Sequence, residues 1–174
     1  MSYIDIDRAK TIAAPVIYVV YGSVQNAKEG ELRAALVTAV TAEGLRQDDW
    51  AGVDFIDEGN ELLKPHTQRS NKCLTFVQSW SVDELDKDNP EDVQRAHALG
   101  AETARRLAPN SPFLVATHID SDGGCVHNHI IILNHDHLTA KAAPKQAGNF
   151  HNVKRVNDEL MAEVGLELSL IHIS

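Results

Sequence analysis

The chain has 174 residues, of which 43% are hydrophobic, so it can bury a core, and its length favours a single domain. Two cysteines make no disulfide framework, and we find no signal peptide and no apolar run of about 20 residues, so we expect a cytoplasmic protein without membrane insertion. A formal charge of −9 argues against indiscriminate binding to nucleic acid, which would need local positive surface.

The first part of the chain predicts a short strand followed by helical segments. Residues 3–6 are expected to form the strand, and the apolar segment 13–21 (AAPVIYVVY) fits either a helix or a strand. Apolar residues at helical spacing predict a packing helix over 28–44, with Gly44 as its stop signal.

The middle of the chain contains clearer signals. The pattern of residues 48–71 indicates no clear element, because Gly, Asp, Asn and Pro are scattered through them. The alternation in CLTFVQSW predicts a strand over 73–80. A helix follows this strand. Asn89 can cap it, Pro90 suits its first position, and two arginines lie at its negative end before Pro109.

The last third predicts a loop over 139–149 and a helix over 153–164 that ends at Gly165. The final residues 169–174 (SLIHIS) carry no stop signal, which suggests that the chain continues into something longer. Together these elements predict an α+β fold with a central, mainly antiparallel sheet and helices packed over one face.

The segment 117–137 (THIDSDGGCVHNHIIILNHDH) organises the chain and holds five of its nine histidines. Two apolar runs of strand length, FLVATH and VHNHIIILN, flank a turn rich in Asp, Ser and Gly, which predicts a hairpin. Side chains at i and i+2 share one face of a strand, so His127 and His129 point the same way. An adjacent antiparallel strand can bring His118 beside them.

Three converging imidazoles suit a divalent transition metal, and three protein ligands leave positions open for water or substrate, as in catalytic metal sites. Burying the rings together without a ligand would leave polar nitrogens unpaired, which favours a metal over three unrelated polar residues. His135 and His137 follow the second strand in a turn-like HDH and are weaker candidates.

Charge is distributed unevenly along the chain. Six acids lie within residues 81–92, whereas residues 138–156 carry four cations and no acid. We expect the cations to help hold a nucleic acid over the metal face, and the acidic segment to lie away from it. The four cations are Lys141, Lys145, Lys154 and Arg155.

In their order along the chain, five segments resemble the plasmid mobilisation relaxases, most closely the MobP type: VIYVVYG, FVQSW, PEDVQRAHALGAETARRL, VATHID with HNHIIILN, and NDELMAEVGLEL. The resemblance covers nearly the whole chain. It implies a fold of the HUH-nuclease and relaxase type, with residues 1–174 forming a nicking domain at the N-terminal end of a longer protein.

The resemblance also implies a reaction. Tyr18 matches the tyrosine that attacks one DNA phosphodiester at an origin of transfer, which leaves a 5′-phosphotyrosyl link and a free 3′ hydroxyl. His118, His127 and His129 match the ligands of a divalent metal, with Mg²⁺ or Mn²⁺ expected and Zn²⁺ or Ni²⁺ as substitutes in a crystal. Tyr21 is the reserve nucleophile, because residues three apart on a helix lie on neighbouring parts of one face.

Asp120 lies two residues beyond His118, where it could orient an imidazole, accept the tyrosine proton or cap the hairpin turn. The partners that the resemblance implies are single-stranded DNA at an origin of transfer, accessory mobilisation proteins and a coupling protein. The sequence departs from the pattern at Cys125, where many relatives have a further histidine, and at Asn128, where the wider superfamily commonly has a hydrophobic residue.

Three other classes compete with this reading. A rolling-circle replication initiator also combines paired histidines with a tyrosine, but it places the tyrosine after the pair, whereas Tyr3, Tyr18 and Tyr21 all precede it. A metal-dependent hydrolase of a small substrate would act through activated water and form no covalent DNA adduct. A non-catalytic DNA-binding relative would show no nicking that depends on a divalent metal.

Overall fold

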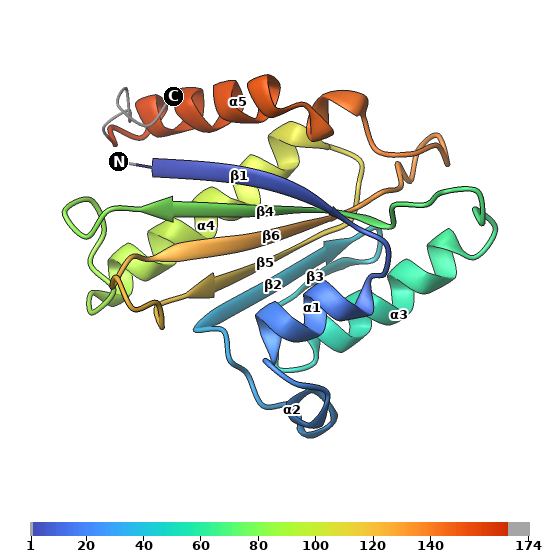
Figure 1. Cartoon of the computed structure of the whole chain (residues 1–174), viewed down its shortest axis with the longest axis horizontal. Coiled ribbons are helices and arrows are strands. Elements are labelled where there is room, and N and C mark those ends of the chain that lie inside the picture. The colour runs from blue at the N-terminus through green and yellow to red at the C-terminus, as the bar shows by residue number, and fades with distance from the viewer. Residues whose placement is uncertain (1, 167–174) are drawn as a thin grey trace.

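A computed structural model describes residues 2–166 and contains a six-stranded sheet between helices on both of its faces (Figure 1). The strand order is β1-β4-β6-β5-β2-β3, and every neighbouring pair is antiparallel. The strands are β1 (Ser2–Ala9), β2 (Leu36–Thr41), β3 (Gly44–Arg46), β4 (Cys73–Trp80), β5 (Phe113–His118) and β6 (His127–Leu133).

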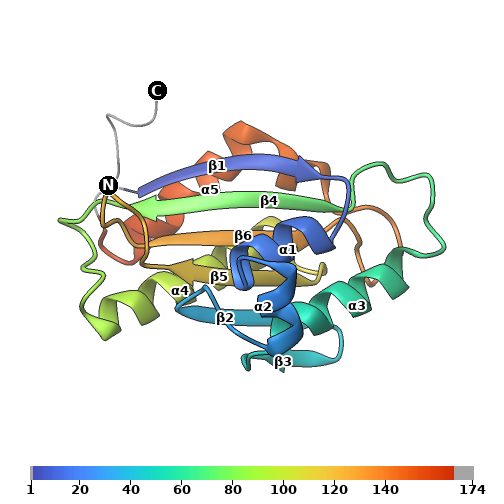
Figure 2. The same ribbon diagram turned by 60° about the horizontal axis from the view of Figure 1, so that its bottom comes forward.

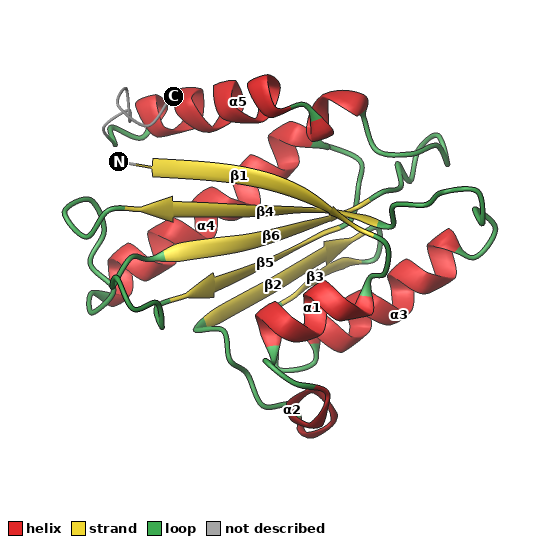
Figure 3. Ribbon diagram, viewed as in Figure 1, coloured by secondary structure: helices red, strands yellow, loops and turns green. Residues whose placement is uncertain are grey.

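The helices cover the sheet in two layers, with α1 and α3 on one face and α4 and α5 on the other (Figure 3). Within residues 2–166, no helix combines the length and apolar character needed to cross a membrane. The helices are α1 (Ala13–Val20), α2 (Val24–Glu29), α3 (Ala51–Leu63), α4 (Pro90–Leu107) and α5 (Phe150–Glu163), with a 3₁₀ turn, η1, at Lys145–Gly148.

The pleat of β6 divides its side chains between the two cores. Ile131 and Leu133 pack in the core beneath α1 and α3, whereas Ile130 and Ile132 pack in the core beneath α4 and α5. Because side chains alternate along a strand, His127 and His129 share the α1/α3 face with Ile131. The continuous apolar run of this strand is therefore explained by burial on both faces.

Several predicted elements are confirmed. The strand over 73–80 has the predicted bounds, and the segment 13–21, left open between helix and strand, is helical. The Asn89 side chain accepts a hydrogen bond from the backbone N–H of Glu91, so it caps α4 as predicted. The terminal stretch 169–174 lies outside the described residues.

The helix predicted over 28–44 is wrong, and so is the expectation that helices cover one face. Gly30, at φ +68°, ends the short helix α2, and the chain then enters β2 and β3, which are joined by a turn through Gly44 at φ +129°. The β-branched residues of LVTAVT favour a strand, and pairing with β5 makes it the better solution. A further helix, α3, lies in the segment 48–71, where the sequence pattern indicated no clear element.

Candidate metal centre and tyrosine site

The hairpin register brings three histidines to one end of the sheet. His118 at the end of β5 pairs directly with His127 at the start of β6, and His129 lies two residues further along β6 on the same face. The ring centroids are 4.6 to 5.2 Å apart, and one ligand nitrogen from each ring lies within 4.8 Å of the other two. The predicted convergence of three imidazoles is therefore present.

The hydrogen bonds of the rings determine which nitrogens remain for a ligand. His118 is fully buried, and its Nε2 lies 2.6 Å from the Val19 carbonyl oxygen, so Nε2–H donates and Nδ1 keeps the lone pair. This Nδ1 is buried and has no hydrogen-bond partner. His127 donates from Nδ1 to the Cys125 carbonyl at 3.2 Å, which leaves its Nε2 available. A buried, unpartnered nitrogen beside two further imidazoles fits a divalent ion.

Protonation does not compete strongly for these nitrogens. Burial is the largest cause lowering the pKa of His118, and it lowers the pKa of His129 to about 3, helped by the charges of neighbouring imidazoles and of Arg33. Both rings are therefore neutral near pH 7. Neutral imidazole is the form that binds a metal, so this part of the site needs no deprotonation before it takes up an ion.

The two candidate tyrosines have different environments. Tyr18 is 59% exposed, whereas Tyr21 is fully buried between α1 and α3. The Tyr21 hydroxyl donates to the Asp49 carbonyl at 2.7 Å and accepts from the Val53 N–H at 3.2 Å, and burial is the main cause raising its pKa. The reserve role given to Tyr21 does not fit this position, because its hydroxyl is already engaged in the core.

Helix α1, which carries Tyr18, packs against β6, the strand that carries two of the histidines (Figure 2). The last carbonyls of a helix have no partner within it and must find one elsewhere. His118 supplies that partner for Val19, the residue after Tyr18, with the ring nitrogen that does not face the cluster. The buried neighbours Val16, Val19 and Val20 hold the helix against the core.

Arg33 is a site residue that the sequence analysis missed, because it fell inside the wrongly predicted helix. Its Nε donates to Asp120 Oδ2 at 3.2 Å, its Nη1 donates to the Tyr18 carbonyl at 3.3 Å, and its guanidinium lies 4.9 Å from the centroid of the Tyr18 ring. Asp120 Oδ1 is 3.6 Å from His118 Nδ1. The predicted position of Asp120 beside an imidazole is therefore present, with Arg33 as an additional partner.

Two of the four cations expected near the histidines lie on the opposite face of the sheet. Lys154 and Arg155 belong to α5, and they form ion pairs with Asp158 and Glu159 at 3.3 and 2.9 Å. Lys141 and Lys145 follow the other end of β6, away from His127. Their expected placement over the metal face is wrong, since sequence proximity to β6 does not determine which face or end a residue reaches.

The acidic segment 81–92 lies at the histidine end of the sheet, contrary to expectation. It follows directly after β4, whose Ser79 pairs with His127. A Cβ atom on Gly124, in the hairpin loop, would lie 3.7 Å from Val82 Cγ1 and 3.8 Å from Lys87 Cε, so the two loops are neighbours. The loop that carries these acids is therefore a neighbour of the hairpin loop.

The weaker candidates His135 and His137 are directed to other partners at the far end of β6. His135 Nδ1 lies 3.0 Å from Arg69 Nη1, which donates to it, and His137 Nδ1 contacts the Asn110 carbonyl. Among the described residues, the group able to hold a metal consists of His118, His127 and His129.

Asn128, the polar residue between the paired histidines, faces the other side of the sheet and is fully paired there. Its Oδ1 accepts from Thr117 Oγ1 at 2.6 Å, and its Nδ2 donates to Gln78 Oε1 at 3.0 Å and to the Ala96 carbonyl at 2.8 Å. Thr117 and Gln78 are its cross-strand neighbours. A one-residue slip of β6 would break this network and bury the histidines, so Asn128 favours the register that forms the site.

His97 of α4 extends the network across the sheet. Its Nε2 lies 2.6 Å from Thr38 Oγ1, and its Nδ1 lies 2.7 Å from Thr117 Oγ1. Burial lowers its pKa from 6.5 to about 4. Since the unfolded chain takes up this proton first, the contribution of His97 is complete above pH 6.5 and is lost as the pH falls towards 4, with a total of about 3 kcal/mol.

We therefore expect a His97→Gln variant to lose less stability than the unchanged protein between pH 7 and pH 4.5. Urea unfolding at several pH values measures this difference, and it separates the His97 contribution from that of the carboxylates, which both proteins share. If both proteins show the same slope of unfolding free energy against pH, the assigned role of His97 is wrong.

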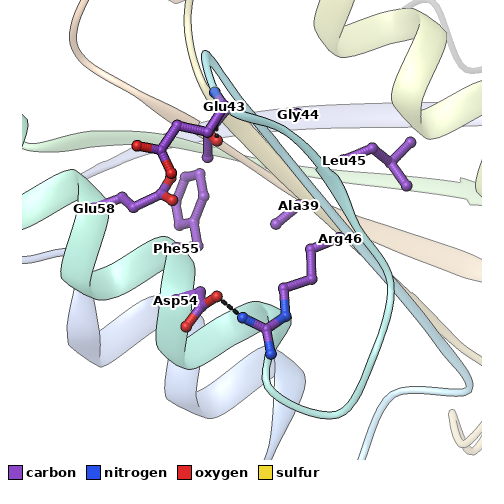
Figure 4. A pocket seen from close by; sticks show the side chains of 9 residues that line it. Ala39, Glu43, Gly44, Leu45, Arg46, Asp54, Phe55 and Glu58 are labelled. Carbon is purple, nitrogen blue, oxygen red and sulfur yellow. Dashed lines mark hydrogen bonds and ion pairs between the residues drawn. The ribbon is translucent and has the colours of Figure 1, made fainter.

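A separate pocket lies under the β2–β3 turn, against α3 (Figure 4). Arg46 forms an ion pair there with Asp54, while Glu43 and Glu58 add two further carboxylates. This surplus of negative charge disfavours an anionic substrate. The pocket contains none of the histidines or tyrosines and is not the candidate site.

Comparison with known proteins identifies relatives over much of the chain. Two Staphylococcus aureus proteins named Protein rlx are 34% identical over 82 residues and 32% identical over 93 residues. These stretches cover 47% and 53% of this chain, but only 24% and 29% of the relatives. The chain thus spans about a quarter of the length of the curated relatives it matches.

Solved structures support the fold. A metal-bound structure of conjugative relaxase TrwC in complex with oriT DNA has a TM-score of 0.56 at 14% identity, and covers 94% of this chain and 68% of that one. A metal-free structure of TrwC with oriT DNA gives 0.52, also at 14% identity, over 96% and 71%. The predicted α+β, HUH-nuclease-like fold is confirmed.

A family model described as "Relaxase: MobA/VirD2-like, nuclease domain" matches residues 20–166. This range contains the three clustered histidines, Asp120 and Arg33, and begins two residues after Tyr18. The resemblance found in the sequence motifs is therefore confirmed over most of the chain, and this protein belongs to the relaxase family with a MobA/VirD2-like nuclease domain.

Proposed function

We propose that this domain nicks one strand of DNA at a plasmid origin of transfer, with Tyr18 as the nucleophile and a divalent metal at His118, His127 and His129. The observation that carries the proposal is the double role of His118. One of its nitrogens is free towards the other imidazoles, and the other holds the carbonyl next to Tyr18. The metal position and the nucleophile thereby belong to one rigid unit, as in-line attack requires.

In the proposed reaction the Tyr18 oxygen attacks phosphorus, the bond from phosphorus to the 3′ oxygen breaks, and the tyrosine proton passes to a base while the 3′ oxygen gains a proton. A bound Mg²⁺ or Mn²⁺ would supply Lewis-acid polarisation of the phosphate. Burial opposes a low pKa at Asp120, but the hydrogen bond from Arg33 and the neighbouring His118 outweigh it, so Asp120 is ionised near pH 7. Asp120 can therefore accept a proton or orient His118.

The competing classes make different predictions at this site. A small-substrate hydrolase has no use for an exposed tyrosine stacked against an arginine next to the histidines, whereas a tyrosine-dependent nickase does. A rolling-circle initiator is disfavoured by chain order, because Tyr18 precedes the histidine pair. We further propose that the domain forms the N-terminal part of a longer mobilisation protein, which acts with accessory proteins and a coupling protein.

Incubation of the purified chain with single-stranded origin DNA and Mn²⁺ or Mg²⁺ tests the proposal. We expect a covalent protein–DNA complex that survives denaturing electrophoresis, requires the divalent ion and releases a fragment with a free 3′ hydroxyl. Scrambled DNA of equal length and a chelator are the controls. Cleavage without a covalent complex would indicate attack by water, and DNA binding without cleavage would indicate a non-catalytic relative.

A further inference from the structure

We propose that Arg33 is a catalytic residue of this site that binds the scissile phosphate while it holds the ring of Tyr18. This inference rests on the proposed function and adds a phosphate-binding group to it. Backbone hydrogen bonds fix residue 33 between helix α1 and strand β5. The N–H of Arg33 donates to the Val20 carbonyl at 2.8 Å, and that of Ala35 donates to the Thr117 carbonyl at 2.8 Å.

The side chain is oriented by three contacts but keeps donors free. Nε is used by Asp120 and one Nη1 proton by the Tyr18 carbonyl, while the guanidinium stacks on the Tyr18 ring. Arginine has five N–H donors, and no described residue accepts from Nη2. The side chain is 30% exposed, so an anion from solvent can reach it.

The ion pair with Asp120 does not by itself account for this arrangement. With side-chain exposures of 30% and 45%, such a pair contributes about 0 to 1 kcal/mol to stability. An arginine already held in place by Asp120 and Tyr18 loses little further freedom when it binds a phosphate, and its planar fork matches two phosphate oxygens. The structure therefore provides a preorganised anion-binding group.

Negative charge beside the histidines favours such a group. The acidic segment 81–92 borders the hairpin loop, and Asp120 adds another negative charge beside His118. Lys87, the cation of that segment, is paired with Asp88. Asp120 therefore places negative charge beside the histidines, and the guanidinium of Arg33 offers a compensating positive charge next to the proposed nucleophile. Its Nη2 donors would then bind a non-bridging oxygen on which charge develops during attack.

The first test measures DNA contact without chemistry. In a Tyr18→Phe background, which keeps the DNA intact, the affinity for single-stranded origin DNA is measured over a range of salt concentrations, with and without Arg33→Gln. One lost phosphate contact on single strands should lower the slope of log affinity against log salt by about 0.7. Arg155→Gln is the matched control, because it also removes one arginine from an exposed ion pair, on the opposite face. It should leave the slope unchanged.

The second test measures the reaction with Tyr18 present. Arg33→Gln should slow single-turnover formation of the covalent complex by about 100-fold, as expected for the loss of one donor to developing charge, and leave Mn²⁺ affinity within about twofold. Arg33→Lys should retain most of the salt slope, because it keeps the charge, but should recover only part of the rate, because it cannot hold Asp120 and the Tyr18 carbonyl together.

The outcomes separate the two proposals. An unchanged salt slope and rate with Arg33→Gln would overturn the role of Arg33 while leaving the nicking function intact. A slower reaction with an unchanged slope would make Arg33 a positioning residue for Tyr18 and overturn the phosphate contact. If the unchanged protein forms no covalent complex but Arg33→Gln still lowers the slope, the nicking function fails and the contact of Arg33 with DNA stands.

Discussion

A Tyr18→Phe variant should form no covalent complex with origin DNA, whereas a Tyr21→Phe variant should still form one and lose stability instead. Removing the hydroxyl of the exposed Tyr18 eliminates the proposed attacking oxygen but keeps the ring that stacks against Arg33. Removing the Tyr21 hydroxyl takes away the partner of the Asp49 carbonyl and of the Val53 N–H at a partly buried position. This loss should cost about 1 to 3 kcal/mol.

Both variants are measured in the same two assays. Denaturing electrophoresis after incubation with DNA and Mn²⁺ reports the covalent complex, and urea unfolding reports stability. Tyr18→Phe should match the unchanged protein in stability and in affinity for metal and DNA. A complex that persists in Tyr18→Phe and disappears in Tyr21→Phe would reverse the assignment. A complex that persists in the double variant would exclude both tyrosines as the nucleophile.

The histidine cluster could be predicted because its determinants are local. The period of two in HNH and a short turn before it are enough to place His127, His129 and His118 on one face. The same locality explains why β4 and the N-terminus of α4 were predicted correctly. Their signals, alternation in one case and the Asn89 cap in the other, act within a few residues.

Arg33 and the choice between the tyrosines depended on longer-range structure. The spacing of Leu32 and Leu36 fits a helix, and only pairing with β5 reveals that Leu36 begins a strand. A helix over 28–44 gives no indication that Arg33 lies near Tyr18. Tyr21 is covered by α3, a helix that the sequence did not predict. Its hydroxyl is bound by the Asp49 carbonyl, which precedes α3, and by the Val53 N–H in the first turn of α3.

The predicted positions of the cations were wrong for a related reason. Net charge and charge runs describe the sequence, whereas DNA responds to which face and end of the sheet a cation reaches. Lys154 and Arg155 follow β6 in sequence, but they belong to α5, which covers the sheet face opposite the histidines. Arg33, from the loop between α2 and β2, provides positive charge beside Asp120 instead.

The histidines should affect metal binding and stability in separable ways. Changing both His127 and His129 to Ala leaves one imidazole, so the variant should bind no Mn²⁺ at concentrations that saturate the unchanged protein. Without metal, its stability should change less than that of a His118 variant, because His127 and His129 are partly buried whereas His118 is fully buried. At a metal concentration 100 times the dissociation constant, the unchanged protein should gain about 2.7 kcal/mol and the double variant nothing.

His118→Ala should behave differently, because this residue also holds helix α1. Its loss removes the Nε2–H that the Val19 carbonyl accepts and leaves a cavity at a fully buried position, so stability should fall even without metal. Titration calorimetry with Mn²⁺ and urea unfolding with and without the ion measure both effects, with His151→Ala on α5 as a control that should retain both properties. If the His127/His129 double variant is still stabilised by the metal, the ion binds elsewhere. If His118→Ala has an unchanged stability without metal, the proposed link between the metal centre and helix α1 is wrong.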